Sequence, residues 1–204
     1  MKNQLIKDSL EKAITYKSYR SLIKKLLIEE KSTGNIQNDD MLNYSALNDK
    51  RMDRLDKTIK IAEETVSSLN QINNNYILLA IAEGWCGDAA QVLPVIHKII
   101  ESSSKIDLKI VLRDENELLM NQFLTNGGKA IPKIILLDET YNVINSWGPR
   151  PSIATQMVND YKESNGGLDA EFKKNLQVWY NKDKGKNIQS DIIELFATTK
   201  VELI

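Results

Sequence analysis

The feature that most constrains the fold is the unbroken apolar run Tyr76–Ala82, which directly follows the asparagines at 73–75. A run this short cannot span a bilayer and is shorter than a typical helix. Because polar and apolar residues do not alternate in it, it predicts a strand buried on both faces, as in a parallel sheet. A helical pattern follows over 87–103, so the middle of the chain predicts a strand that leads directly into a helix.

The elements that follow continue this alternation. The patterns predict strands at 106–112, 133–137 and 142–147, with helices at 114–125 and 152–163. The resulting order, β-α-β-α-β-β-α, indicates an α/β fold.

Helical periodicity flanks this central part on both sides, over 4–30, 40–71, 169–182 and 189–197. We therefore divide the chain into an N-terminal helical extension (1–71), a central domain (72–165) and a C-terminal helical segment (166–204). The extension should pack on the core, because isolated amphipathic helices are marginally stable in water.

Composition excludes several classes of function. A net charge of −1 suggests neither a nucleic-acid nor a membrane partner. The single cysteine rules out an internal disulfide. With only one cysteine and one histidine in the whole chain, a structural metal site is improbable, and we expect no cofactor. A lone cysteine and a first segment without a secretory apolar run favour a cytoplasmic location. The oligomeric state stays open.

Cys86, the one cysteine, follows the predicted strand and begins the predicted helix. Free amide N–H groups and the positive end of the helix dipole favour an anion there. The position therefore predicts a thiol whose pKa is lowered and which is reactive near neutral pH. The alternative is that Cys86 is a small, inert buried residue.

Four features in register resemble the thioredoxin family over about residues 70–163: Trp85-Cys86-Gly87, Pro94, Ile131-Pro132 and Gly148. The resemblance implies a three-layer thioredoxin-like fold, with a central mixed sheet of about four strands and added helices at both ends. It also implies a cis peptide bond at Ile131–Pro132 beside Cys86. More narrowly, Trp-Cys-Gly-Asp-Ala and the helical segment at 51–58 look like a bacterial subgroup with an N-terminal helical extension, for which no settled activity is implied.

The sequence departs from the family pattern at Ala89, where a second cysteine would normally resolve the mixed disulfide. Ordinary dithiol thioredoxin activity is therefore not expected. The family's buried acid would lie in the strand at about 76–80, and that stretch contains no acidic residue.

Charged residues are expected to tune the thiol. Asp88 and Glu83 would raise the pKa of Cys86, whereas Arg113, Lys133 and Arg150 could offset them. Alternatively, these arginines are solvated surface charges. The candidate substrate surface comprises Trp85, Gly87, Asp88, Ile131, Pro132, Gly148, Arg150 and Arg113.

Three functions compete. Cys86 could act as the catalytic residue of a monothiol oxidoreductase, exchanging with a low-molecular-weight thiol or with a disulfide of a partner protein. The chain could instead be a non-catalytic module that binds an extended peptide along the proline loop. A single-cysteine iron–sulfur carrier is the weakest hypothesis, because no clear glutathione-binding signature surrounds Ile131-Pro132.

Overall fold

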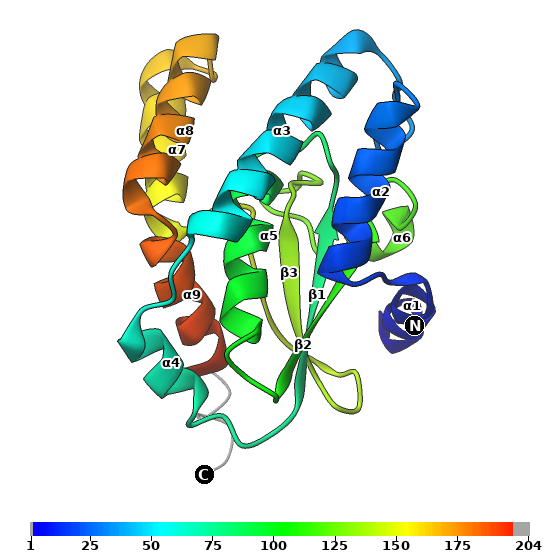
Figure 1. Ribbon diagram of the computed structural model, residues 1–204, viewed down its shortest axis with the longest axis vertical. Helices are drawn as coiled ribbons and strands as arrows, with labels where there is room; N and C mark the ends of the chain where they lie inside the picture. The colour runs from blue at the N-terminus through cyan, green and yellow to red at the C-terminus, as the bar shows by residue number, and fades with distance from the viewer. Residues whose placement is uncertain (1, 198–204) are drawn as a thin grey trace.

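A four-stranded mixed sheet forms the centre of the molecule (Figure 1). The computed structural model describes residues 2–197. The strands are β1 (Tyr76–Ala82), β2 (Ile106–Leu112), β3 (Lys133–Asp138) and β4 (Val143–Trp147), in the spatial order β2-β1-β3-β4. β1 pairs in parallel with β2 and antiparallel with β3, and β3 pairs antiparallel with β4. This mixed sheet with flanking helices confirms the predicted α/β fold class.

The two central strands carry the deepest part of the core. Residues 78–82 of β1 and 134–137 of β3 have no exposed surface. Burial on both faces is what the unbroken apolar pattern of β1 predicts. Each large aliphatic side chain buried in this way contributes about 1.5–3 kcal/mol of hydrophobic stabilisation.

Helices surround the sheet. They are α1 (Lys2–Lys12), α2 (Tyr16–Ile28), α3 (Asp39–Thr58), α4 (Glu63–Leu69), α5 (Gly87–Ile100), α6 (Glu117–Met120), α7 (Ser152–Asn165), α8 (Ala170–Asp183) and α9 (Lys186–Ala197). In Figure 1, α5 lies in front of the sheet, with α3 and α9 beside it, and α7 and α8 run side by side beyond it. The Tyr161 and Phe172 rings, 4.3 Å apart, stack between α7 and α8.

Three predicted helices differ from the observed ones. The stretch 40–71 is divided into α3 and α4, because the backbone becomes extended at Ile59 (φ −66°, ψ 133°). The stretch 4–30 is divided into α1 and α2 at Ile14, which exchanges backbone hydrogen bonds with Ile110 of β2 at 2.9 and 2.8 Å. The predicted helix 114–125 is reduced to the single turn α6.

The N-terminal helices are fastened to the rest of the molecule by buried polar contacts as well as by apolar packing. Arg20 of α2, only 7% exposed, donates to the Asp49 carboxylate of α3 at 2.7 Å. The ring of Tyr16 stacks on His97 of α5 with ring centres 4.4 Å apart. His97, three turns along α5 from Cys86, is thus a packing residue.

Between residues 2 and 197, none of the helices is both long and apolar enough to cross a membrane.

Candidate functional site

Cys86 is the N-cap residue of α5, immediately after the loop that leaves β1. Its sulfur accepts a hydrogen bond from the Ala89 N–H at 3.4 Å, and the thiol donates to the Ile131 carbonyl oxygen at 3.3 Å. The Ile131–Pro132 peptide bond is cis. The structure therefore places the Cys86 thiol against the Ile131 carbonyl, at the residue joined by this cis bond to Pro132.

Burial dominates the acid–base chemistry of the thiol. Cys86 is 9% exposed, and its desolvation, followed by the nearby charge of Asp88, raises the pKa of the thiol to about 12. The backbone N–H groups of Ala89 and Asp88 and the cation of Arg150 lower this pKa, but they do not outweigh burial. The expectation that the helix N-terminus yields a lowered pKa is therefore wrong for this geometry.

Asp88 and Arg150 form an ion pair next to the thiol. Arg150 Nη2 lies 2.7 Å from Asp88 Oδ2, and the Tyr180 hydroxyl of α8 donates to Asp88 Oδ1 at 3.0 Å. Burial raises the pKa of the Asp88 carboxyl, while Arg150 and Tyr180 oppose that rise. Arg150 thus lies on the Cys86 side of the molecule, where its charge favours the thiolate.

Gly148 allows the Arg150 loop to approach the proline loop. Its φ is +115°, and a Cβ at this position would lie 2.3 Å from the Pro132 carbonyl oxygen. Only glycine combines that backbone conformation with so close a contact. The two loops therefore pack directly on each other beside Cys86.

Arg113 and Lys133 do not join this group. Arg113 pairs with Asp114 at 2.8 Å, and its guanidinium lies 4.8 Å from the centre of the Trp85 ring. Lys133 Nζ donates to the Thr125 hydroxyl at 3.2 Å, and burial lowers the pKa of Lys133. Neither cation is among the main causes of the shifted pKa of Cys86.

Comparison with known proteins identifies the family. A model described as thioredoxin matches residues 34–162. The chain belongs to the thioredoxin family. The matched segment includes α3, so this helix is part of what the family model recognises in the chain.

Two solved structures resemble this thioredoxin-family chain over most of its length. A protein of unknown function from Pseudomonas aeruginosa is 16% identical, with a TM-score of 0.60, covering 91% of this chain and 99% of that one. An HIV epitope-scaffold is 18% identical, with a TM-score of 0.57, covering 90% of this chain and 98% of that one. At these identities the likeness shows the fold alone. A comparison with curated proteins found no match.

Sequence reasoning identified Glu83 as a charge near the thiol, but it did not predict that this acid is fully buried. Glu83, just after β1, has no exposed surface, and its Oε1 accepts the Asp114 N–H at 3.0 Å. Burial raises the pKa of Glu83. The pKa of the fully buried Tyr19 hydroxyl is raised by burial and then by the charges of Cys86 and Glu83, so all three groups share one environment. An acid directly after a buried strand was the available signal.

Polar side chains from segments that precede β1 hold the loop before Cys86. The Gly84 N–H donates to the Thr33 hydroxyl at 2.7 Å, and the Asn48 amide donates to the Gly84 carbonyl at 2.9 Å. Both Thr33 and Asn48 are buried. Both backbone groups of Gly84 are therefore bound by side chains that precede β1 in the chain.

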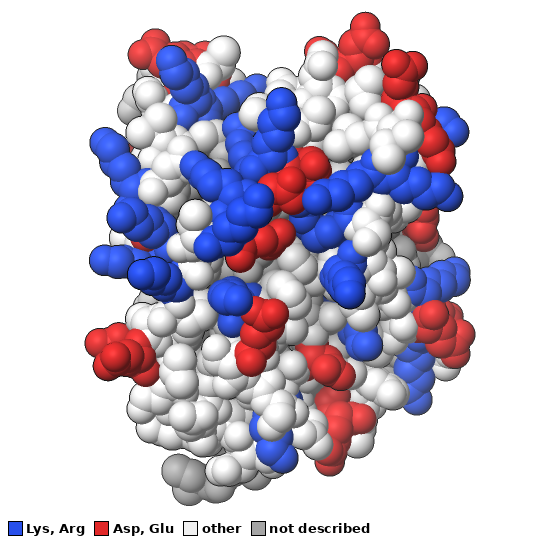
Figure 2. All heavy atoms as spheres, viewed as in Figure 1, with Lys and Arg blue, Asp and Glu red and all other residues white. Residues whose placement is uncertain are grey.

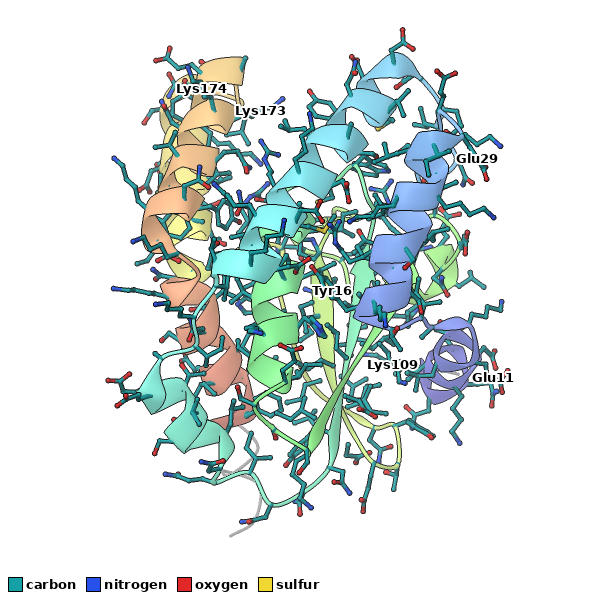
Figure 3. All side chains as sticks on the ribbon, in the orientation of Figure 1. Glu11, Tyr16, Glu29, Lys109, Lys173 and Lys174 are labelled. Atoms are coloured by element: carbon teal, nitrogen blue, oxygen red, sulfur yellow. The ribbon has the colours of Figure 1, made fainter. Side chains whose placement is uncertain are left out.

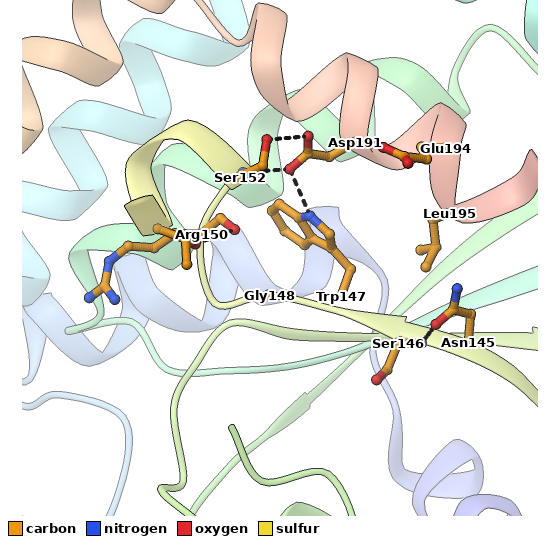
Figure 4. A pocket seen from close by; sticks show the side chains of 10 residues that line it. Asn145, Ser146, Trp147, Gly148, Arg150, Ser152, Asp191, Glu194 and Leu195 are labelled. Atoms are coloured by element: carbon orange, nitrogen blue, oxygen red, sulfur yellow. Dashed lines mark hydrogen bonds between the residues drawn. The ribbon is translucent and has the colours of Figure 1, made fainter. Parts of the chain in front are cut away.

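An open pocket of about 400 Å³ lies between β4 and α9 (Figure 4). At its centre Asp191 accepts hydrogen bonds from the Trp147 indole at 3.0 Å and the Ser152 N–H at 2.7 Å. Figure 4 shows the Arg150 guanidinium directed away from these groups. Asp191 therefore fixes the end of β4 and the start of α7, the two elements that flank the Arg150 loop.

No cluster of three or more candidate metal ligands occurs within residues 2–197.

Proposed function

We propose that this protein performs monothiol thiol–disulfide exchange through Cys86. The sulfur of Cys86 attacks a disulfide R–S–S–R′, forms Cys86–S–S–R, and releases R′ as a thiolate that takes up the proton lost by Cys86. The observation that carries the proposal is the position of the thiol, at the N-cap of α5 and in hydrogen-bond contact with the Ile131 carbonyl of the proline loop.

The alanine at position 89 explains why the exchange would stop at the mixed disulfide. It stands in the position of the family's second thiol and has no exposed surface. Without a resolving thiol, an external thiol must release the bound half of the substrate. Dithiol-driven turnover of a protein disulfide such as that of insulin is therefore not expected.

The raised pKa sets the pace of the reaction. Because the pKa of the thiol is raised to about 12, only a very small fraction of Cys86 is thiolate at pH 7. Exchange should therefore be slow at neutral pH and accelerate as the pH rises. A substrate that replaces the Ile131 carbonyl contact with a hydrogen-bond donor to the sulfur would favour the thiolate.

The same burial of Cys86 supports a second candidate, a non-catalytic module that holds an extended peptide along the proline loop. The test is the reaction of the folded protein with dipyridyl disulfide between pH 6 and pH 10, followed by intact mass, with Cys86→Ser as control. A pH-dependent mixed disulfide supports exchange. A folded protein that stays unmodified throughout would favour the binding module.

A further inference from the structure

Two hydrogen-bond donors that are far apart in sequence, Arg51 of α3 and Gln177 of α8, lie close to Gly87, the residue after Cys86. A Cβ built on Gly87 would lie 3.5 Å from Arg51 Nη1 of α3 and 3.5 Å from Gln177 Nε2 of α8. The two nitrogens are therefore no farther apart than twice that distance, a gap that one carboxylate can bridge with a hydrogen bond to each. α3 and α8 stand on either side of the N-terminus of α5 in Figure 1.

Buried contacts hold both donors in place. Arg51 Nη1 donates to Asn48 Oδ1 at 2.8 Å, and the Asn48 amide in turn donates to the Gly84 carbonyl at 2.9 Å. Asn48 has no exposed surface, so it ties the guanidinium to the loop before Cys86. On the other side, Gln177 Oε1 accepts from the Gln91 amide at 2.8 Å, which leaves the Gln177 Nε2 directed toward Gly87.

The charge of Arg51 is not neutralised locally. Among residues 2–197, no carboxylate lies within ion-pair distance of Arg51. Asp88 is the acid whose charge raises the pKa of Arg51, but it is already paired with Arg150. Burial and the neighbouring Arg54 lower the pKa of Arg51, and the negative charge of an incoming anion would offset this lowering. Figure 2 shows Lys and Arg side chains over the upper half of this face, interspersed with Asp and Glu.

We propose that Arg51 and Gln177 bind a carboxylate of the substrate, and that the protein therefore prefers small anionic disulfides. This inference rests on the proposed exchange at Cys86. The guanidinium offers several donors in a planar fork that matches a carboxylate, and the Gln177 amide adds one from the opposite side. With the carboxylate held in front of Gly87, the disulfide of a short molecule reaches the neighbouring Cys86 sulfur. One half then forms the mixed disulfide and the other leaves as a thiol.

The experiment compares the reaction of the full chain with two small disulfides that differ in charge. Second-order rate constants are measured at pH 8 with dithiobis(nitrobenzoate), which is anionic, and with dipyridyl disulfide, which is neutral. The quantity of interest is the ratio of the anionic to the neutral rate constant, because global changes in Cys86 reactivity cancel in it. Arg51→Gln should lower this ratio at least ~10-fold, the size expected for losing a charged hydrogen bond.

Two further variants sharpen the result. Arg54→Gln removes the same charge from the same helix, but Arg54 donates to Asn181 at 2.6 Å, so the ratio should fall by less than about twofold if contact rather than net charge matters. Gly87→Ala adds a methyl group at ordinary contact distance from both donors and should lower the ratio without unfolding the protein. It serves as the test if Arg51→Gln does not fold.

The outcomes separate the two proposals. If dipyridyl disulfide modifies Cys86 but the ratio is the same in wild type, Arg51→Gln and Gly87→Ala, the exchange chemistry stands and the carboxylate site is wrong. An equal loss in Arg51→Gln and Arg54→Gln would also overturn the site, because it would show a general charge effect. If neither reagent modifies Cys86 in the folded wild type, the exchange proposal fails and the inference falls with it.

Discussion

Two buried carboxylates lie close to Cys86 in sequence, and the fold treats them differently. Asp88 contacts a guanidinium at 2.7 Å and accepts the Tyr180 hydroxyl at 3.0 Å. The Thr33 hydroxyl and the Asp114 N–H lower the pKa of Glu83, but within residues 2–197 its Oε2 has no hydrogen-bond partner. Burial raises the pKa of both, but only Asp88 has a cation in contact. Asp88 is thus supported as an anion beside the thiol, whereas the ionisation of Glu83 is opposed.

The largest expected effect comes from removing the cation of the Asp88 pair. Arg150→Ala leaves an almost fully buried carboxylate without its partner, and we expect a loss of about 3 kcal/mol in the free energy of unfolding. It should also raise the pKa of Cys86 and slow its labelling at fixed pH. Urea unfolding and iodoacetamide kinetics measure the two effects.

Arg113→Ala is the matched control for Arg150→Ala. Arg113 is also paired with a neighbouring aspartate, but it is not among the main causes of the shifted pKa of Cys86. Its loss should leave thiol labelling unchanged. Equal labelling rates in wild type and Arg150→Ala would contradict the electrostatic role given to Arg150.

Asp88→Asn sharpens the comparison from the other side. The charge of Asp88 is the second-largest cause of the raised pKa of Cys86, and the amide can still accept the Tyr180 hydroxyl. Labelling of Cys86 at pH 8 should therefore become about tenfold faster, the change that follows from one pKa unit. Unchanged kinetics would mean that burial alone sets the thiol pKa.

Tyr180→Phe tests the hydroxyl that completes the Asp88 pair. The substitution keeps the ring in the core and removes one hydrogen bond to a carboxylate, so we expect a loss of about 1.5 kcal/mol in the free energy of unfolding. The loss should largely disappear when Tyr180→Phe is combined with Asp88→Ala, because the two residues act through one contact. Additive losses in the double variant would show that the hydroxyl acts elsewhere.

Glu83→Gln should have the smallest effect, and its size should depend on pH. The folded-state pKa of Glu83 is raised, so the stability it contributes is fully present below the unfolded carboxyl value and is lost as pH rises through the folded value. The free energy of unfolding of Glu83→Gln minus that of wild type should therefore increase between pH 4 and pH 8. Unfolding curves at both pH values measure this difference, and a difference that decreases with rising pH would contradict the prediction.

The parts of the fold that follow from local pattern were predictable. The unbroken apolar run Tyr76–Ala82 has few alternatives to a central strand, and the structure places it there. The division at Ile59 was not predictable, because apolar residues keep helical spacing on either side of it and no glycine or proline marks the break.

The candidate site also has a part that the sequence could predict and a part that it could not. Cys86 and the Ile131-Pro132 pair could be found from spacing, but the pKa of the thiol could not, because the burial that raises it comes from elements distant in sequence. The same holds for Arg51 and Gln177, which meet at Gly87 only after α3 and α8 have folded onto α5. A pattern within one segment contains no information about such a meeting.

The backbone bridge between Ile14 and Ile110 has a consequence for solubility. β2 is an outer strand of the sheet, and its free N–H and C=O groups would otherwise offer a template for strand pairing with another copy. Ile14, between α1 and α2, forms backbone hydrogen bonds with Ile110 of this strand, and both helices also contact β2. A chain that lacks its first fifteen residues or so should thus become prone to aggregation before it loses its folded core.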